Sequence, residues 1–320
     1  MKVLLTGAFG NLGFWTLQEL LQRGHTVRCF DLKTDKTVAK AKLVAGKAEV
    51  VWGNLRQADE VAAAVQGQDL IVHLGFIIPP ATGEDPAEAY EVNVGGTRNV
   101  LEAARSQQER PKLLFASSFD VYGPTQDKEP PRTVNDPVQP TDAYSEHKIQ
   151  CEDLVKQSGL EWAIYRFCDM PPLPPATPHK PHPIMFTIPL KQRFEMLHPR
   201  DGAMAIACGL ESPIWGKIWL IGGGSSCQIR YGDYLQTMME RMGVGRLPEE
   251  AFTSEPYCTD WVDSSESQVL LNYQRHSFQQ IIDELAAATD PGPVAHLLMP
   301  LLRPFVRRSI LKMSPYLKRT

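Results

Sequence analysis

The chain has 320 residues, of which 43% are hydrophobic and 22% are charged, a composition typical of a globular protein with a sizeable core. Its formal net charge of −4 disfavours nucleic-acid binding, and no apolar run reaches the length of a membrane-spanning helix. The first residues lack the pattern of a signal peptide, and six cysteines without CxxC spacing indicate neither a zinc site nor disulfides, so we expect reduced thiols in a cytoplasmic protein.

The first half of the chain alternates short apolar runs with helical patterns. Strands are predicted at VLLT (3–6), TVRCFD (26–31), DLIVHLG (69–75), KLLFASS (112–118) and EWAIYRF (161–167), and helices at 12–23, 61–66 and 94–107. Strands that alternate with helices pair in parallel through right-handed crossovers. The pattern therefore predicts an α/β fold, a doubly wound parallel sheet with helices on both faces.

The alternation of strands and helices stops after residue 169. Residues 170–189 contain eight prolines, which predict an extended loop. This loop follows the carboxyl end of a strand, where open α/β sheets bind ligands, so it is either a linker or part of a substrate site. Beyond it we expect a helix at 202–211, a strand at 217–223 and mostly helical structure from 231 to 288.

The motif TGAFGNLG, residues 6–13, follows the first strand and opens a helix. Gly7 permits a tight turn, Gly10 lets the backbone approach a pyrophosphate, and Gly13 allows close packing of helix on strand. The second strand ends on Asp31, which is positioned to accept hydrogen bonds from ribose hydroxyls and to repel a 2′-phosphate. The motif therefore favours NAD over NADP, although Arg28 and Lys33 leave NADP open.

The stretch DAYSEHK places Tyr144 and Lys148 four residues apart, hence one turn apart on the same face of a helix. Taken alone, such a pair is more often an ordinary solvated helix face than a catalytic pair. Its meaning depends on the other motifs of the chain.

Those motifs occur in a fixed order. TGAFGNLG and YSEHK are joined by GNLR (53–56), HLG (73–75), NVGGTRNVLEAA (93–104), SSFDVYG (117–123) and IGGG (221–224). In this set the chain resembles the extended short-chain dehydrogenase/reductases, the NAD-dependent epimerase/dehydratase family, over residues 1 to about 240. The resemblance implies a Rossmann NAD-binding domain of residues 1–166 plus about 196–222, and a small C-terminal substrate lobe of 167–195 and 223–320. It also implies a homodimer that pairs through the helices beginning near 93 and 144.

The resemblance implies roles for the residues of this chain that match the family's motifs. Tyr144 would exchange a proton with a substrate hydroxyl or carbonyl while hydride passes to or from the nicotinamide, and Ser118 would hydrogen-bond the same oxygen. Lys148 would lower the pKa of the phenol and hold the nicotinamide ribose. The implied cofactor contacts are Gly7, Phe9, Gly10, Asn11, Leu12, Gly13, Asp31, Asn54, Leu55, Leu74, Gly75, Asn93, Tyr144 and Lys148.

Several positions depart from the family pattern. Asn54 stands where an aspartate is common, and its amide can still accept from the adenine amino group. Gly75 replaces the usual alanine, which would loosen the wall beside the nicotinamide. Asp120 occupies the position of a glutamate base in sugar-nucleotide dehydratases, so it is either a second base or a loop carboxylate, and Phe119 replaces a companion acid.

The substrate anchors also differ. Asp169 replaces an asparagine that contacts nucleotide sugars, and a carboxylate there would repel a diphosphate. Arg193 lies one residue out of register with a phosphate-binding arginine, while Phe76 opens the apolar segment FIIPP. We therefore expect an oxidoreductase or epimerase acting at a secondary alcohol or ketone, either a nucleotide sugar or a more hydrophobic compound. The alternatives are a dehydratase that uses Asp120 and a non-catalytic NAD(P)-binding sensor.

Two further features stand apart from these motifs. His179 and His182 have no neighbouring cysteine or carboxylate, so we expect no metal site. The last 30 residues carry six Lys or Arg and no Asp or Glu, and Pro300 and Pro304 predict that any helix there is short. Its apolar side chains either pack against the protein or another subunit, or attach to an anionic membrane. If helical, the apolar face holds Leu302, Phe305, Val306, Ile310 and Met313, opposite Arg303, Arg307, Arg308 and Lys312.

Overall fold

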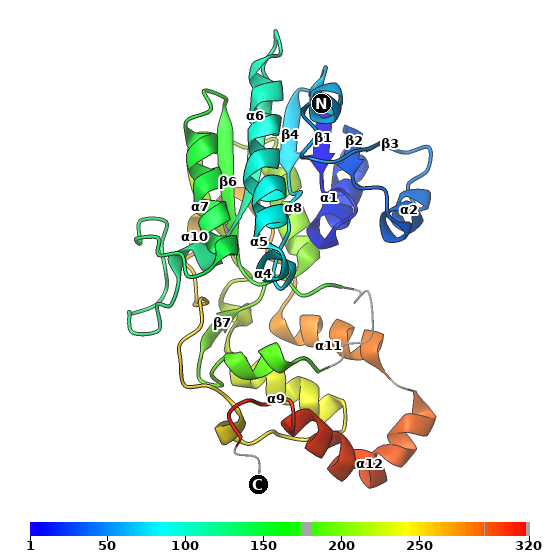
Figure 1. The fold of residues 1–320 in the computed structure, drawn as a ribbon, viewed down its shortest axis with the longest axis vertical. Coiled ribbons are helices and arrows are strands. Elements are labelled where there is room, and N and C mark those ends of the chain that lie inside the picture. Colours follow the sequence, from blue (N-terminus) through cyan, green and yellow to red (C-terminus); the bar gives the residue numbers. More distant parts are fainter. Residues whose placement is uncertain (174–180, 291, 318–320) are drawn as a thin grey trace.

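The structure, a computed structural model, describes residues 1–173, 181–290 and 292–317. Its centre is a parallel sheet of seven strands in the order β3-β2-β1-β4-β5-β6-β8 (Figure 1). The strands are β1 (Lys2–Thr6), β2 (Thr26–Asp31), β3 (Glu49–Trp52), β4 (Leu70–His73), β5 (Lys112–Ser118), β6 (Trp162–Phe167) and β8 (Lys217–Ile221). The predicted doubly wound α/β fold is therefore confirmed.

Helices cover both faces of this sheet. One face carries α1 (Asn11–Gln22), α8 (Pro199–Gly209) and α10 (Ser265–Leu271), and the other carries α3 (Ala58–Val65), α6 (Gly96–Arg105) and α7 (Ala143–Lys156). Each face has its own apolar core, and the neighbouring residues Leu4 and Leu5 of β1 point into different cores. Burial on both sides explains why the strands read as continuous apolar runs.

Short elements connect the layers. Helix α2 (Asp35–Lys42) follows β2, and a 3₁₀ turn (Phe119–Tyr122) follows β5. Helices α4 (Ala81–Glu84) and α5 (Pro86–Tyr90) lead through a π-helical turn (Glu91–Gly95) into α6. These connections bring several loops to the carboxyl ends of the strands.

A smaller lobe lies at those carboxyl ends (Figure 1). It contains the antiparallel pair β7 (Arg193–Glu195) and β9 (Gln228–Arg230), the helices α9 (Tyr231–Arg241), α11 (Phe278–Thr289) and α12 (Pro293–Leu311), and 3₁₀ turns at Pro183–Thr187, Ser225–Cys227 and Glu249–Ala251. A third apolar cluster, which includes Phe186, Leu235, Ile281 and Ile310, forms its core. The predicted domain boundaries near residues 166, 196 and 222 stay a prediction.

The sequence does not predict β3, α2, β7 or β9. Strands of three or four residues are too short to display a period of two, and α2 is an eight-residue helix without a buried residue. The prediction of a short helix near the end of the chain is wrong, because Pro300 and Pro304 lie inside the 19-residue α12. Figure 1 shows this helix bending in its middle. The N–H that Pro304 lacks would have faced the carbonyl of Pro300, which explains the bend.

Within the described part of the chain, none of the helices combines the length and the apolar character needed to cross a bilayer.

Candidate active site

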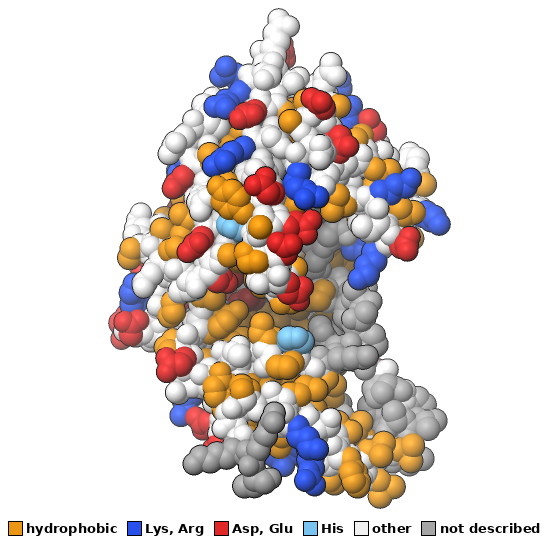
Figure 2. All heavy atoms as spheres, in the orientation of Figure 1, with side chains coloured by type: hydrophobic (Ala, Val, Ile, Leu, Met, Phe, Trp, Pro, Cys, Tyr) orange, Lys and Arg blue, Asp and Glu red, His pale blue; other side chains and the backbone are white. Residues whose placement is uncertain are grey.

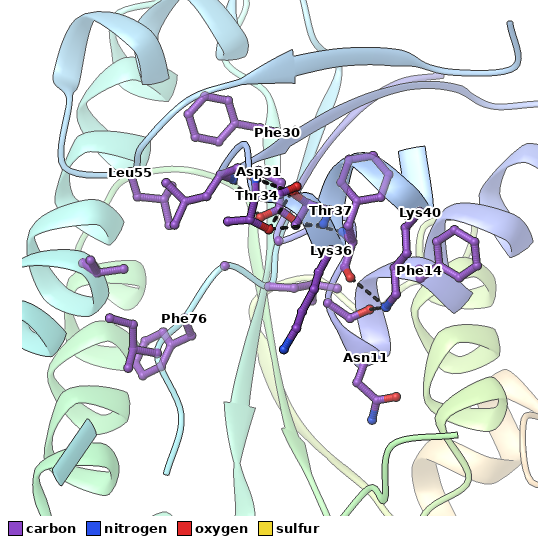
Figure 3. Close-up of a pocket in the computed structure, with 18 of the residues that line it drawn as sticks. Asn11, Phe14, Phe30, Asp31, Thr34, Lys36, Thr37, Lys40, Leu55 and Phe76 are labelled. Atoms are coloured by element: carbon purple, nitrogen blue, oxygen red, sulfur yellow. Dashed lines mark hydrogen bonds between the residues drawn. The ribbon is translucent and has the colours of Figure 1, made fainter. Parts of the chain in front are cut away.

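A cavity of about 780 Å³ opens at the carboxyl ends of β1, β2 and β4 (Figure 3). The strand order reverses between β1 and β4, which is where doubly wound sheets bind ligands. Nine of the predicted cofactor contacts line this cavity, namely Gly7, Phe9, Gly10, Asn11, Asp31, Asn54, Leu55, Leu74 and Gly75. The fold thus brings together residues that lie up to 68 positions apart in the sequence.

The loop between β1 and α1 is shaped for close approach of backbones. Gly7 has a φ of +65°, and a Cβ atom there would lie 2.8 Å from the backbone nitrogen of Gly75. A Cβ atom at Gly13 would lie 2.0 Å from the carbonyl oxygen of Gly7. Helix α1 begins at Asn11 without a side-chain cap or an acidic residue in its first turn, so its first N–H groups stay open to an anion. This cradle fits the pyrophosphate of a dinucleotide.

Asp31, the last residue of β2, stands beside this cradle. Its carboxylate accepts hydrogen bonds from the backbone N–H groups of Phe9 and Leu32, each at 2.8 Å. Burial raises the pKa of Asp31, and these two hydrogen bonds oppose that shift. Each carboxylate oxygen retains acceptor capacity, so Asp31 can also receive ribose hydroxyls.

The cations near Asp31 are not those expected. Arg28 pairs with Glu49 at 2.8 Å, and neither it nor Lys33 lines the cavity. Instead, two lysines of α2, Lys36 and Lys40, line the cavity. Lys40 donates to the carbonyl oxygens of the glycine loop, at 2.8 Å to Phe9, and Figure 3 shows Lys36 pointing into the cavity. Sequence reasoning missed both, because they lie in a polar exposed helix.

The wall beside the glycine loop, formed by Gly75 and Leu55, is closed rather than loose. A Cβ atom at Gly75 would lie 2.9 Å from Cδ1 of Leu55, so Leu55 fills the space that the missing methyl leaves. The expectation of a looser wall at Gly75 is therefore wrong. Asn54 keeps its amide oxygen on the backbone N–H of Arg56, at 3.0 Å, while it lines the cavity.

Asn93, Leu12 and Gly13 support the cavity from behind. Asn93 is fully buried, and its amide pairs with both the N–H (2.7 Å) and the carbonyl (3.0 Å) of Ile77, which lines the cavity. Leu12 packs toward Gly202 of α8. Asn93 thereby fixes the loop after β4, and its direct contact with a cofactor stays a prediction.

Helix α7 holds Tyr144 and Lys148 one turn apart, as the sequence predicts. Asp142 caps this helix by accepting the backbone N–H of Ser145 at 2.8 Å, and the Ser145 hydroxyl accepts the backbone N–H of Asp142 in return. The capping box fixes the first turn, which carries Tyr144.

Lys148 is buried, with 4% of its surface exposed. Its Nζ donates to the carbonyl oxygen of Ala116 at 2.7 Å and lies 3.5 Å from the centroid of the Phe76 ring and 5.6 Å from that of Tyr144. Burial lowers the pKa of Lys148 to about 7. Phe76 also lines the cavity, so its ring connects the lysine with the cofactor cradle.

Ser118, at the end of β5, lies beside the Tyr144 hydroxyl and accepts the backbone N–H of Asp120 at 3.2 Å. Burial raises the pKa of Tyr144 above its ordinary value, the carboxylate of Asp120 adds to this shift, and the nearby Ser118 hydroxyl opposes it. The phenol is therefore less acidic in this structure than a free tyrosine, contrary to the effect expected from Lys148.

Asp120 and Asp169 form an acidic pair near Tyr144. Burial raises the pKa of Asp120, and the charge of Asp169 raises it further. Burial raises the pKa of Asp169 to about 6, although its carboxylate accepts the hydroxyl of Thr259 at 3.0 Å. Such a pair repels an anionic group and can hold a proton near neutral pH.

Arg193 and Phe119, both expected to contact substrate, contact other parts of the protein in this structure. The guanidinium of Arg193 forms a buried ion pair with Asp260, at 2.8 Å from Nη2 to Oδ2, and also donates to the carbonyls of Thr125 and Lys128. Phe119 is 2% exposed and belongs to the core of the sheet. A substrate phosphate would have to compete with Asp260 for Arg193.

The loop after β6 contributes to the cavity. Pro172 and Leu173 line it, and the indole N–H of Trp15 in α1 donates to the carbonyl of Leu173 at 2.9 Å. Of the two interpretations of the proline-rich segment, this arrangement favours a ligand-binding loop. Residues 174–180 of the segment, including His179, lie outside the described residues.

One group of described residues has the side-chain types of a metal site. His198, Asp201 and His276 bring ligand atoms within 4.8 Å of one another. Asp201 accepts the backbone N–H groups of Arg275 and His276 and contacts the His276 ring at 2.6 Å. Nδ1 of His198 accepts the backbone N–H of Arg200, so Nε2 of a neutral ring keeps its proton. The group therefore connects α8 with the segment before α11.

Comparisons with known proteins identify the family of this chain. Residues 3–172 match the model of the family described as NAD dependent epimerase/dehydratase. The human protein 3 beta-hydroxysteroid dehydrogenase type 7 is 32% identical over 164 residues, which are 50% of this chain and 43% of that protein. A Mycobacterium tuberculosis protein named 3 beta-hydroxysteroid dehydrogenase/Delta 5-->4-isomerase is 33% identical over 166 residues, 50% of this chain and 44% of that protein. The matched part thus spans less than half of these relatives.

Solved structures share the fold over most of the chain. A UDP-glucuronic acid 4-epimerase from Bacillus cereus, in complex with UDP-glucuronic acid and NAD, has a TM-score of 0.76 at 21% identity, covering 90% of this chain and 99% of that one. A dTDP-glucose 4,6-dehydratase from Bacillus anthracis in complex with NAD also has a TM-score of 0.76, at 18% identity, covering 92% of this chain and 98% of that one.

Proposed function

Since this chain belongs to the NAD dependent epimerase/dehydratase family, we propose that it is an NAD-dependent oxidoreductase that acts at a secondary alcohol or ketone. The observation that carries this proposal is the grouping of Ser118 and Tyr144 with the buried Lys148, which lies one turn along α7 from Tyr144. These three side chains adjoin, through Phe76, a cavity whose glycine loop fits a dinucleotide.

The chain's own residues would hold NAD in that cavity. The open N–H groups at the start of α1 would receive the pyrophosphate, and Asp31 would accept from the adenosine ribose. When bound, NAD supplies the acceptor and donor of hydride. The solved structures named above contain NAD, which supports the same cofactor here.

Tyr144 would give and take the proton at its hydroxyl oxygen. Ser118 would hydrogen-bond the same substrate oxygen through its hydroxyl, which lies beside that of Tyr144. Lys148, with a pKa lowered to about 7 by burial, would carry its charge most fully below that pH and favour the phenolate. Lys148 is buried, so water has little access to its ammonium group.

The charges around Tyr144 favour a neutral substrate. Asp120 and Asp169 repel a diphosphate, and Arg193 is already paired with Asp260. We therefore propose a hydrophobic secondary alcohol or ketone rather than a nucleotide sugar. The names of the two sequence relatives, both hydroxysteroid dehydrogenases, support a hydrophobic alcohol.

A second candidate is dehydration with Asp120 as the base. Its carboxyl lies close enough to Tyr144 to raise the pKa of the phenol, and burial raises its own pKa, which makes it a stronger base than a solvated carboxylate. A non-catalytic NAD(P) sensor is the outcome if no substrate turns over.

The test is mass spectrometry of products after incubation of the protein and NAD with hydrophobic secondary alcohols and with nucleotide sugars. Loss of two hydrogens from an alcohol supports the proposal, loss of water supports Asp120 as a base, and a change of retention at constant mass supports epimerisation. Tyr144→Phe should abolish turnover and leave NAD affinity nearly unchanged, because the hydroxyl acts on the substrate. Full turnover by this variant contradicts the mechanism.

We also propose that the protein is a cytoplasmic homodimer that pairs through α6 and α7. The six cysteines are all free thiols, which suits a reducing compartment. Light scattering should give twice the mass of one chain, and a monomer at all concentrations contradicts the dimer.

A further inference from the structure

Helix α12 presents two different apolar faces. One face packs on the smaller lobe, where Ile310 is 3% exposed and Val306 and Met313 join the same apolar cluster. The expectation that this segment packs on its own protein is correct for these residues. The second face has no such partner among the described residues.

This second face is a stripe of large apolar side chains exposed to solvent. The exposed fractions are 74% for both Leu301 and Phe305, and 45% and 46% for Leu298 and Leu302. Their spacing of i, i+3, i+4 and i+7 aligns them along one side of the helix. The expected grouping of Leu302 and Phe305 with Ile310 is therefore wrong, because the helix separates them onto different faces.

Positive charges continue the same stripe. Arg308 and Lys312, which are exposed, follow Leu301 and Phe305 at intervals of seven residues, so they lie on the same side of the helix. Figure 2 shows hydrophobic side chains gathered over α12, with Lys and Arg side chains beside them. Residues 291–320 contain no acidic residue, so no acid of this segment neutralises these cations.

A cationic cavity of about 540 Å³ lies on the flank of α12. Arg303 and Arg307 reach it from the helix, and Arg246 reaches it from the turn after α9. The turn is shaped for this approach, because Gly245 has a φ of +76° and a Cβ atom there would lie 2.0 Å from Nη2 of Arg303. The single acid in the cavity, Glu240, pairs with Arg246 at 2.8 Å, which leaves a surplus of positive charge.

We propose that α12 docks the protein onto an anionic phospholipid bilayer. Leu301 and Phe305 enter the boundary between headgroups and acyl chains, while Arg308 and Lys312 contact the anionic surface. Arg303 and Arg307, which bond the smaller lobe on the other side of the helix, add to the positive field that attracts the protein to this surface. A second copy of this chain is a poorer occupant, since its own segment 291–320 offers no acidic side chain to pair with Arg308 and Lys312. The proposal does not depend on the catalytic activity.

The test is co-sedimentation of the full chain with vesicles of phosphatidylcholine alone and with vesicles that also contain phosphatidylserine. We expect binding to the anionic vesicles that weakens as salt is added. Arg308→Gln with Lys312→Gln should weaken this binding roughly 25-fold, since each cation near an anionic surface contributes about five-fold. Leu301→Ser with Phe305→Ser should weaken it by more than roughly ten-fold at every salt concentration.

Matched controls separate docking from general surface effects. Val269, 87% exposed in α10, provides the apolar control Val269→Ser, and Lys47→Gln with Arg110→Gln, both exposed and outside α6 and α7, provides the charge control. Both should bind like the wild type, and all variants should keep the wild-type melting temperature. Absence of vesicle binding, or unchanged binding by the Leu301 and Phe305 variant, overturns the proposal. Self-association without lipid that Phe305→Ser abolishes also overturns it, in favour of a second copy on this face.

Discussion

Replacing Asp31 by asparagine should change the cofactor preference from NAD toward NADP. The substitution keeps the shape of the side chain and removes the negative charge at the end of β2. Asp31 accepts from Phe9 and Leu32 at 2.8 Å, so its position beside the glycine loop is fixed in the folded protein. Lys36 and Lys40 of α2 lie close by and would then face a 2′-phosphate unopposed.

The expected size follows from electrostatics. Two like unit charges about 4 Å apart repel by about 4 kcal/mol at an effective dielectric constant near 20. The open cavity and the two lysines reduce this, and we take half, about 2 kcal/mol, or roughly 30-fold in NADP affinity. NAD loses the charge assistance of its ribose hydrogen bond, about 1 kcal/mol or roughly five-fold. The ratio of the two affinities should therefore shift roughly 150-fold toward NADP.

The measurement is equilibrium binding of both cofactors to the wild type and to Asp31→Asn at one fixed ionic strength, because salt screens the interaction. Asp35→Asn is the matched control, an exposed acid of α2 that does not line the cavity. Its affinity ratio should equal that of the wild type. An unchanged ratio in Asp31→Asn, with the protein folded, refutes the assignment of cofactor preference to this carboxylate.

Three further substitutions test other parts of the structure. Lys148→Met should lower kcat by roughly 10²-fold or more, because it removes the cation beside the phenol, and wild-type steady-state rates would contradict that role. Asp120→Asn should let alcohol oxidation persist to lower pH, since the carboxylate raises the pKa of Tyr144 and the oxidation requires the deprotonated phenol; a pH profile that does not move, or a complete loss of turnover, argues for another role of Asp120. Asp201→Ala should lower the free energy of unfolding by roughly 3 kcal/mol, measured in urea, because this buried carboxylate accepts two backbone N–H groups and contacts His276; a change near zero would show that the link between α8 and α11 adds no stability.

Local patterns made the cradle and the catalytic helix predictable. The glycine loop needs Gly7 and Gly13 because side chains there would collide with backbone, and the four-residue spacing of Tyr144 and Lys148 indicates a shared helix face. The residues that make these contacts lie within a few positions of one another or on neighbouring strands. A sequence pattern can therefore predict them.

Contacts between distant segments were beyond such patterns. Asp169 meets Thr259, 90 residues away, and Arg193 meets Asp260, 67 residues away, through the packing of the smaller lobe. The pattern at each position alone says nothing about these partners. The same packing decides which face of α12 is covered, which is why the sequence grouped Phe305 with the wrong neighbours.

The proposed reaction is hydride transfer between NAD and the substrate, with Tyr144 as the proton donor and acceptor. It is tested most directly with NAD and a hydrophobic secondary alcohol deuterated at the carbinol carbon, by mass spectrometry of the reduced cofactor. We predict deuterium in the NADH formed by the wild type and roughly 10³-fold slower deuteride transfer in Tyr144→Phe. Deuteride transfer by Tyr144→Phe at the wild-type rate would contradict the role of Tyr144. Hydride transfer itself would be contradicted if the wild type binds NAD and the alcohol but transfers no deuterium.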